Sequence, residues 1–126
     1  MRYVRLNISF LDEFIFNMKI RIKIWLEDKG RPVLGDGRLL LLKAIDETGS
    51  IQSAAKKSGV SYRHAWGQVK KLEKRLGVKL LDHTIGGKGG GGSKLTTEAK
   101  AFIEKYEAIG KKIHSWVEEN FEDLDI

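Results

Sequence analysis

The side chains best suited to specific recognition chemistry lie at the start of a predicted helix, residues 61–76. They are Tyr62, Arg63, His64, Trp66 and Gly67. An arginine can form two hydrogen bonds with O6 and N7 of a guanine, and an apolar ring can contact a thymine methyl group. A helix that enters the DNA major groove contacts bases through its N-terminal residues. The pattern therefore favours base recognition, with Arg63 as the first candidate.

Several of these residues also have a structural interpretation. Trp66 lies roughly 85° around the helix from the apolar stripe, so it could simply seal the edge of the domain. His64 is as compatible with a phosphate or with water as with a base. A glycine in mid-helix costs about 1 kcal/mol relative to alanine, and either close approach to DNA or a tolerated defect would explain Gly67. Gln68 flanks the core and could be structural.

A second set of residues suits the phosphates of a nucleic-acid backbone. Ser50, Gln52 and Ser61 fall at predicted helix N-termini, where backbone N–H groups favour phosphate. Lysines supply the rest of the set: Lys56, Lys57, Lys70, Lys71 and Lys74. Contacts of this kind position a protein on DNA but carry no sequence information. Some of these lysines are expected to be plain solvated surface.

The positive charge is concentrated in the middle of the chain. Residues 51–100 carry 11 Lys/Arg and 3 Asp/Glu, whereas residues 101–126 carry 3 and 7; the whole chain has a net charge of +6. A localised basic patch is typical of a phosphate-backbone binder, although a solvated lysine-rich face would give the same count.

The elements that must position these residues read as a helix-turn-helix. Helices are predicted over residues 38–48, 51–58 and 61–76, with Gly49 ending the first and Gly59 allowing the sharp turn before the third. Ser50 and Ser61 are the expected N-caps. At 100° per residue, one face of the third helix holds a core stripe. Its members are Ala65, Val69, Leu72 and Leu76.

A β-hairpin wing is predicted next. Residues 79–84 and 93–95 are strand candidates, and residues 85–92 between them hold six glycines and Lys88. Lys88 and the loop amides, within a wing of residues 85–93, could reach the DNA backbone or minor groove; a loop without contacts is the alternative. A P-loop is excluded because Lys88 is followed by Gly89 and a strand.

The N-terminal region predicts a strand over residues 19–26, because polar and apolar residues alternate there. A turn at residues 27–30 and a connector at 32–37 follow, with Asp36 able to cap the next helix. Residues 1–17 show no clear periodicity.

The last helix begins with Thr96 or Thr97 as its cap. Its apolar residues recur at heptad spacing: Ala99, Phe102, Tyr106, Ile109, Ile113 and Trp116. This seam predicts a dimer arm, and packing onto its own domain is the alternative.

Several stretches resemble the DNA-binding domain of the ModE family of molybdate-responsive transcription regulators. The stretches are I-D-E-T-G-S-I at 45–51, A-A-K-K-S-G-V-S-Y at 54–62, A-W at 65–66 and G-G-K-G-G-G-G-S-K-L-T at 86–96. The wider LysR-type winged helix family shares L-E-x-x-L-G at 72–77 and L-T at 95–96. The resemblance covers roughly residues 18–116.

The resemblance implies a winged helix, a homodimer formed largely through the long C-terminal helix, and a pseudo-palindromic operator. In that family a molybdate-binding region of small β-barrel domains follows. The residues up to Ile126 hold no counterpart, so molybdate sensing is not carried over and any small-molecule effector is unknown.

Composition argues against other classes. There are no cysteines, and the three histidines are too scattered to suggest a metal site. The sequence shows no carboxylate pair or nucleophile–base set with catalytic spacing, so neither an enzyme nor a cofactor is expected. We expect no membrane partner, because no apolar run reaches membrane-spanning length, and the N-terminus fits a signal peptide poorly; this predicts a cytoplasmic protein.

The sequence as a whole predicts a mainly α fold with a small β component: a winged helix-turn-helix with a long C-terminal dimerisation helix. We divide the chain into an N-terminal extension (1–17), a DNA-binding domain (18–96), and a dimerisation helix with an acidic tail (97–126). The function expected is a sequence-specific double-stranded DNA-binding transcription regulator acting as a homodimer. A non-specific architectural protein and a winged-helix protein-interaction module are the alternatives.

Overall fold

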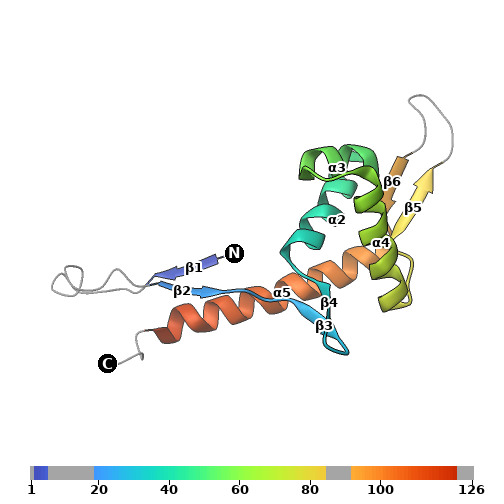
Figure 1. Ribbon diagram of the computed structural model, residues 1–126. Helices are drawn as coiled ribbons and strands as arrows, with labels where there is room; N and C mark the ends of the chain where they lie inside the picture. The colour runs from blue at the N-terminus through green and yellow to red at the C-terminus, as the bar shows by residue number, and fades with distance from the viewer. Residues whose placement is uncertain (1, 6–18, 85–91, 122–126) are drawn as a thin grey trace. The chain divides into compact units, whose positions relative to one another are not determined.

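The computed structural model describes residues 2–5, 19–84 and 92–121 (Figure 1). In this part of the chain, four helices and three two-stranded antiparallel sheets give the mainly α fold that the sequence predicts. The chain divides into two compact units, Trp25–Glu104 and a second unit made of Met1–Ile24 with Lys105–Ile126. The functional division at residues 17 and 96 stays a prediction.

The helix-turn-helix consists of α2 (Asp36–Thr48), α3 (Ile51–Ser58) and α4 (Tyr62–Leu76). Both predicted serine caps are confirmed: Ser50 Oγ accepts from the Ser53 amide and Ser61 Oγ accepts from the His64 amide, each over 3.0 Å. Gly49 ends α2 with φ of 81°, in the left-handed region that glycine enters at little cost. These local signals fix where each helix starts and stops.

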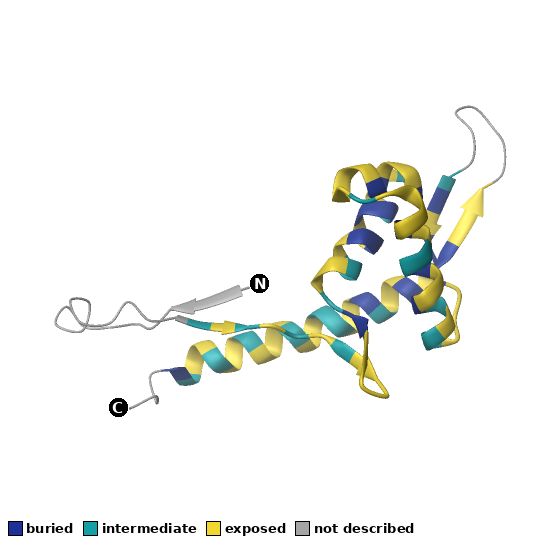
Figure 2. Cartoon of the chain, viewed as in Figure 1, coloured by how far each residue is buried: buried dark blue, intermediate teal, exposed yellow. Residues whose placement is uncertain are grey.

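The core of the larger unit lies between these helices and the start of the last one (Figure 2). Helix α2 contributes Leu42 and Ile45, and α4 buries the predicted stripe except for Leu76, which is half-buried. Ala54 and Ala99 have no exposed surface, which is consistent with close approach of helices at small residues.

The region before α2 differs from the prediction. The predicted strand over 19–26 is two strands, β2 (Lys19–Ile22) and β3 (Leu26–Asp28), and the predicted connector holds strand β4 (Arg31–Leu34). Strands β3 and β4 form a hairpin around the predicted turn. Its central residues, Lys29 and Gly30, both have positive φ, as a type I′ hairpin turn requires. Half-buried and exposed residues do alternate from 20 to 26, as predicted. Residues 23–25, however, belong to neither strand.

Asp36 is not the helix cap. It is the first residue of α2, and Gly35 occupies the N-cap position with no side-chain hydrogen bond. Because Asp36 lies in the first turn, its carboxylate is placed near the positive end of the helix dipole instead.

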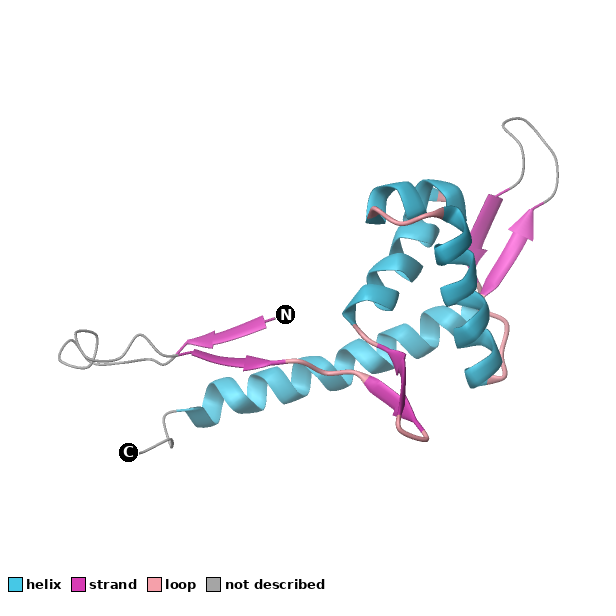
Figure 3. Cartoon of the chain, viewed as in Figure 1, coloured by secondary structure: helices cyan, strands magenta, loops and turns pink. Residues whose placement is uncertain are grey.

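The wing hairpin is formed by β5 (Leu81–Thr84) and β6 (Gly92–Leu95), drawn in magenta beside α4 in Figure 3. They pair antiparallel, from Leu81 opposite Leu95 to Thr84 opposite Gly92. This confirms the predicted hairpin, with the first strand beginning two residues later than expected. The predicted tip, including Lys88, lies outside the described residues.

The wing base is fastened to the turn between α2 and α3. The Ser93 amide donates to the Gly49 carbonyl over 2.7 Å, and the Leu95 amide donates to Asp46 Oδ1 over 3.1 Å. A Cβ atom at Gly92 would lie 2.9 Å from the Gly49 oxygen, so the two backbones approach as closely as glycine allows. The hairpin is therefore held in a fixed position against the helix-turn-helix.

Helix α5 runs from Thr97 to Asn120, and Thr96 Oγ1 accepts from the Ala99 amide over 3.1 Å, which identifies Thr96 as the cap. In the second unit, β1 (Arg2–Arg5) pairs antiparallel with β2. Tyr106 donates its hydroxyl to the Ile24 carbonyl over 3.0 Å. Among the described residues, no helix is long and apolar enough to span a bilayer.

Candidate nucleic-acid interface

A polar cleft of about 310 Å³ lies where α3, α4 and the wing base meet. The helices contribute Ser50, Gln52, Tyr62 and Trp66 to its lining, all of which the sequence singled out. The wing contributes His83, Thr84 and Ser93. Residues from three elements therefore converge on one concave surface.

The wing side of the cleft is held by short hydrogen bonds. His83 Nδ1 and Ser93 Oγ are 2.9 Å apart, and Thr84 Oγ1 accepts from the Gly92 amide over 2.9 Å. Sequence reasoning missed these residues, because only the register between β5 and β6 brings them opposite one another. Their place immediately beside the glycine-rich stretch was the available signal.

Trp66 and Lys70 form a small cluster on α4. Trp66 is 45% exposed, and Lys70 Nζ lies 5.6 Å from the centre of its ring. The same Nζ makes an ion pair of 3.0 Å with Glu73. Because Trp66 keeps nearly half of its surface exposed, sealing the domain edge does not fully account for it.

Arg63 and Lys71 are exposed on α4 and make no hydrogen bond or ion pair with other described residues. Both cations are thus available to a partner. A Cβ at Gly67 would meet nothing within 4 Å, so the fold of the chain itself does not require glycine there.

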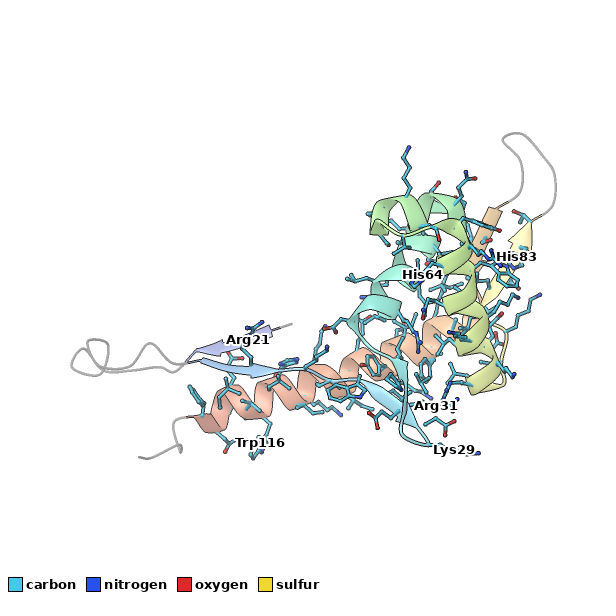
Figure 4. All side chains as sticks on the ribbon, in the orientation of Figure 1. Arg21, Lys29, Arg31, His64, His83 and Trp116 are labelled. Atoms are coloured by element: carbon cyan, nitrogen blue, oxygen red, sulfur yellow. The ribbon has the colours of Figure 1, made fainter. Side chains whose placement is uncertain are left out.

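His64 lies on a different surface from this cleft. It lines a groove with residues of α2 and the end of α3, whereas His83 belongs to the wing (Figure 4). The structure thus separates His64 from Tyr62 and Trp66, with which the sequence grouped it. Its contact with DNA stays a prediction.

Gln68 has a structural role, as the sequence suggested. Its Oε1 accepts from Arg38 Nε, and Arg38 Nη1 also donates to the Pro32 carbonyl over 2.9 Å. Arg38 thereby connects α2, α4 and β4.

Glu73 fixes the connection from α4 to the wing. Its carboxylate accepts from the Leu80 amide over 2.8 Å. Partial burial alone would raise the pKa of Glu73, but hydrogen bonds from backbone amides and from Lys70 outweigh it, so the pKa lies below its ordinary value.

Residues 37–100 match the sequence profile of the lysR family of bacterial regulatory helix-turn-helix proteins. The chain belongs to this family. The matched region contains α3, α4 and both wing strands, which are the elements that line the cleft.

Individual members of related groups are also similar. The transcriptional regulator ModE of Haemophilus influenzae is 34% identical over 97 residues, covering 77% of this chain and 35% of that protein. The molybdenum-pterin-binding protein MopB of Rhodobacter capsulatus is 41% identical over 76 residues, covering 60% of this chain and 28% of that protein. The chain spans about a third of the length of these curated relatives.

Two solved structures share the fold. The DNA-binding domain of CbnR in a complex with DNA matches with a TM-score of 0.50 and 27% identity, covering 70% of this chain and 95% of that one. DarR of Vibrio fischeri, also in complex with DNA, matches with a TM-score of 0.51 over 72% of this chain and 29% of that one. Its 18% identity supports the fold alone.

Proposed function

We propose that this protein is a sequence-specific double-stranded DNA-binding transcription regulator that acts as a homodimer. The observation that carries the proposal is the convergence of Ser50, Gln52, Tyr62 and Trp66 with the wing base on one cleft. Winged helix-turn-helix proteins insert one helix into the major groove while neighbouring elements contact the backbone. The cleft supplies surfaces for both tasks.

In this proposal the first turns of α4 enter the major groove. Arg63 contacts a guanine, since it is exposed and has no partner among the described residues. Lys71, Ser50 and Ser61 contact phosphates, and Lys88 of the wing extends the contact to the backbone or minor groove. Lys70 is a weaker candidate because Glu73 already pairs with it.

The proposed dimer forms through α5. Its seam is largely uncovered towards the C-terminus, where Ile109 is 59% exposed and Trp116 is 64% exposed, with Ile113 between them at 40%. Phe102 and Tyr106 continue the seam and are half-buried within the chain. Because a twofold dimer presents two recognition helices, it predicts an inverted-repeat site.

The relatives support the same function. ModE is named a transcriptional regulator, and the structure of the CbnR domain is that of its complex with DNA. We propose that this chain performs no catalysis and, because its proposed partner is double-stranded DNA, that it acts in the cytoplasm.

The test is selection of bound duplexes from a random DNA pool, with and without molybdate or tungstate. An enriched inverted repeat is expected, and affinity should fall steeply with salt because phosphate contacts release counterions. Binding without enrichment would favour an architectural protein. No binding at low salt would favour a protein-interaction module. Dependence on the oxyanion would identify an effector.

A further inference from the structure

A second hollow, here called the groove, lies between α2, the end of α3 and α4. It shares no lining residue with the polar cleft between α3, α4 and the wing base, which is called the nucleic-acid cleft below. Its volume is about 630 Å³. The floor is apolar: Leu41 and Ala44 are buried there, and Leu40 is 66% exposed at its edge. Cavities that hold small organic molecules commonly have volumes of about 300–1,000 Å³ and mostly apolar linings.

Two side-chain contacts mark the ends of this groove along α2. Arg38 bonds to Gln68 of α4, and Glu47 makes an ion pair of 3.0 Å with Lys57 of α3. At 1.5 Å per residue, the positions of Arg38 and Glu47 are roughly 14 Å apart along the helix. A groove this short suits a small molecule better than a peptide helix several turns long.

The charge of the lining selects the kind of molecule. Arg38, Lys43 and Lys57 are cationic, and Glu47 is the one carboxylate among the described lining residues. With three cations and one carboxylate, the lining has a positive net charge. A positively charged concave surface attracts anions, and the apolar floor favours an anion with an apolar body.

We propose that this groove binds an organic anion with an apolar body and a carboxylate or sulfonate group. The apolar body contacts Leu40 and Leu41, and the anionic group pairs with the cationic lining. His64 and Gln68 of α4 form one wall, so occupancy is expected to alter DNA affinity. That consequence rests on the proposed function, whereas binding itself does not.

The test uses the full chain without DNA, so its failure is distinct from failure of DNA binding. The probe is 8-anilinonaphthalene-1-sulfonate, an apolar organic anion, titrated while the histidine ring resonances are followed by NMR. His64 reports on the groove, His83 on the nucleic-acid cleft and His114 on α5. We expect saturable shifts at His64 alone. Shifts confined to His83 or His114 would overturn the proposal.

Two comparisons test the chemistry of the site. The uncharged analogue N-phenyl-1-naphthylamine should bind about tenfold more weakly, since it lacks the charge that pairs with the lining; equal binding would contradict an anion site. Lys43→Glu should weaken probe binding by about tenfold, whereas Lys111→Glu on the exposed surface of α5 should not. Leu40→Gln, at an exposed position, tests the apolar part of the site independently and should also weaken probe binding. Circular dichroism establishes that each variant is folded. Unchanged binding in both groove variants would overturn the assignment.

Discussion

The amide of Ser93 donates a hydrogen bond of 2.7 Å to the carbonyl oxygen of Gly49. This contact joins the base of the wing to the turn that precedes α3. Ser50, the cap of α3, is the next residue after Gly49, so the same few atoms place both the helix N-terminus and the wing. This backbone approach and the hydrogen bond from the Leu95 amide to Asp46 thus set the position of the wing relative to α3.

Replacing Gly92 by alanine should disturb that approach. The new Cβ would lie 2.9 Å from the Gly49 oxygen and 3.2 Å from Thr84 Oγ1, so the backbone must shift. We expect a loss of about 1–3 kcal/mol in the free energy of unfolding, the usual cost of inserting a methyl group into a filled space. Urea denaturation measures this loss, and an unchanged midpoint would show that the two backbones are not held together as described.

Gly67→Ala is the control for Gly92→Ala, because the space around a new Cβ at Gly67 is open. No atom lies within 4 Å of the new Cβ, so we expect the protein to gain about 0.5–1 kcal/mol in the free energy of unfolding from better helix propensity. DNA affinity separates the two explanations of this glycine. A loss of affinity in the more stable protein would mean that the helix backbone approaches DNA closely, and unchanged affinity would mean a tolerated defect.

The seam of α5 is tested by Trp116→Ala. Trp116 is 64% exposed in the single chain, so its replacement should cost the monomer little. Because buried tryptophans often dominate interfaces, we expect dimer affinity to fall at least about tenfold. Sedimentation equilibrium measures this, with Lys111→Ala as the control on another face of the same helix. A wild-type chain that is monomeric at high concentration would contradict the dimer.

Glu73→Gln should change how stability depends on pH. The pKa of Glu73 is lowered in the folded chain, so its ionised form stabilises the fold above the ordinary glutamate pKa, and this contribution is lost as pH falls through the folded pKa. The variant should be less stable near neutral pH by about 1.5–3 kcal/mol, the range for hydrogen bonds to a charged group. The difference between the two proteins should shrink in acid. A difference independent of pH would contradict the assigned role.

The sequence was most informative where a single residue decides a local structure. Ser50 and Ser61 predicted the starts of α3 and α4 because a cap bonds to an amide only three residues away. Thr96 did the same for α5. The heptad pattern of α5 could likewise be recognised from the sequence, because its spacing depends on the geometry of a single helix.

The failures came from structure that depends on distant partners. The turn predicted at residues 27–30 is present at Lys29 and Gly30, but the strand β4 that follows it was not predicted. Pro32 can lie in β4 because β4 is an edge strand of a two-stranded sheet. His83 and Ser93 joined the site only through the register of β5 with β6. His64 shares a helix with Tyr62 but lines a different hollow, and its contact with DNA stays a prediction.

The central claim, that α4 recognises bases, is tested most directly by measuring the affinities of wild-type, Arg63→Ala and Lys71→Ala proteins. Each is titrated with the selected duplex and with duplexes carrying single base-pair changes. Arg63→Ala should cost about 1–3 kcal/mol on the selected duplex and remove discrimination at one base pair. Lys71→Ala should weaken all duplexes equally and reduce the salt dependence. An equal loss on every sequence for Arg63→Ala would contradict the account.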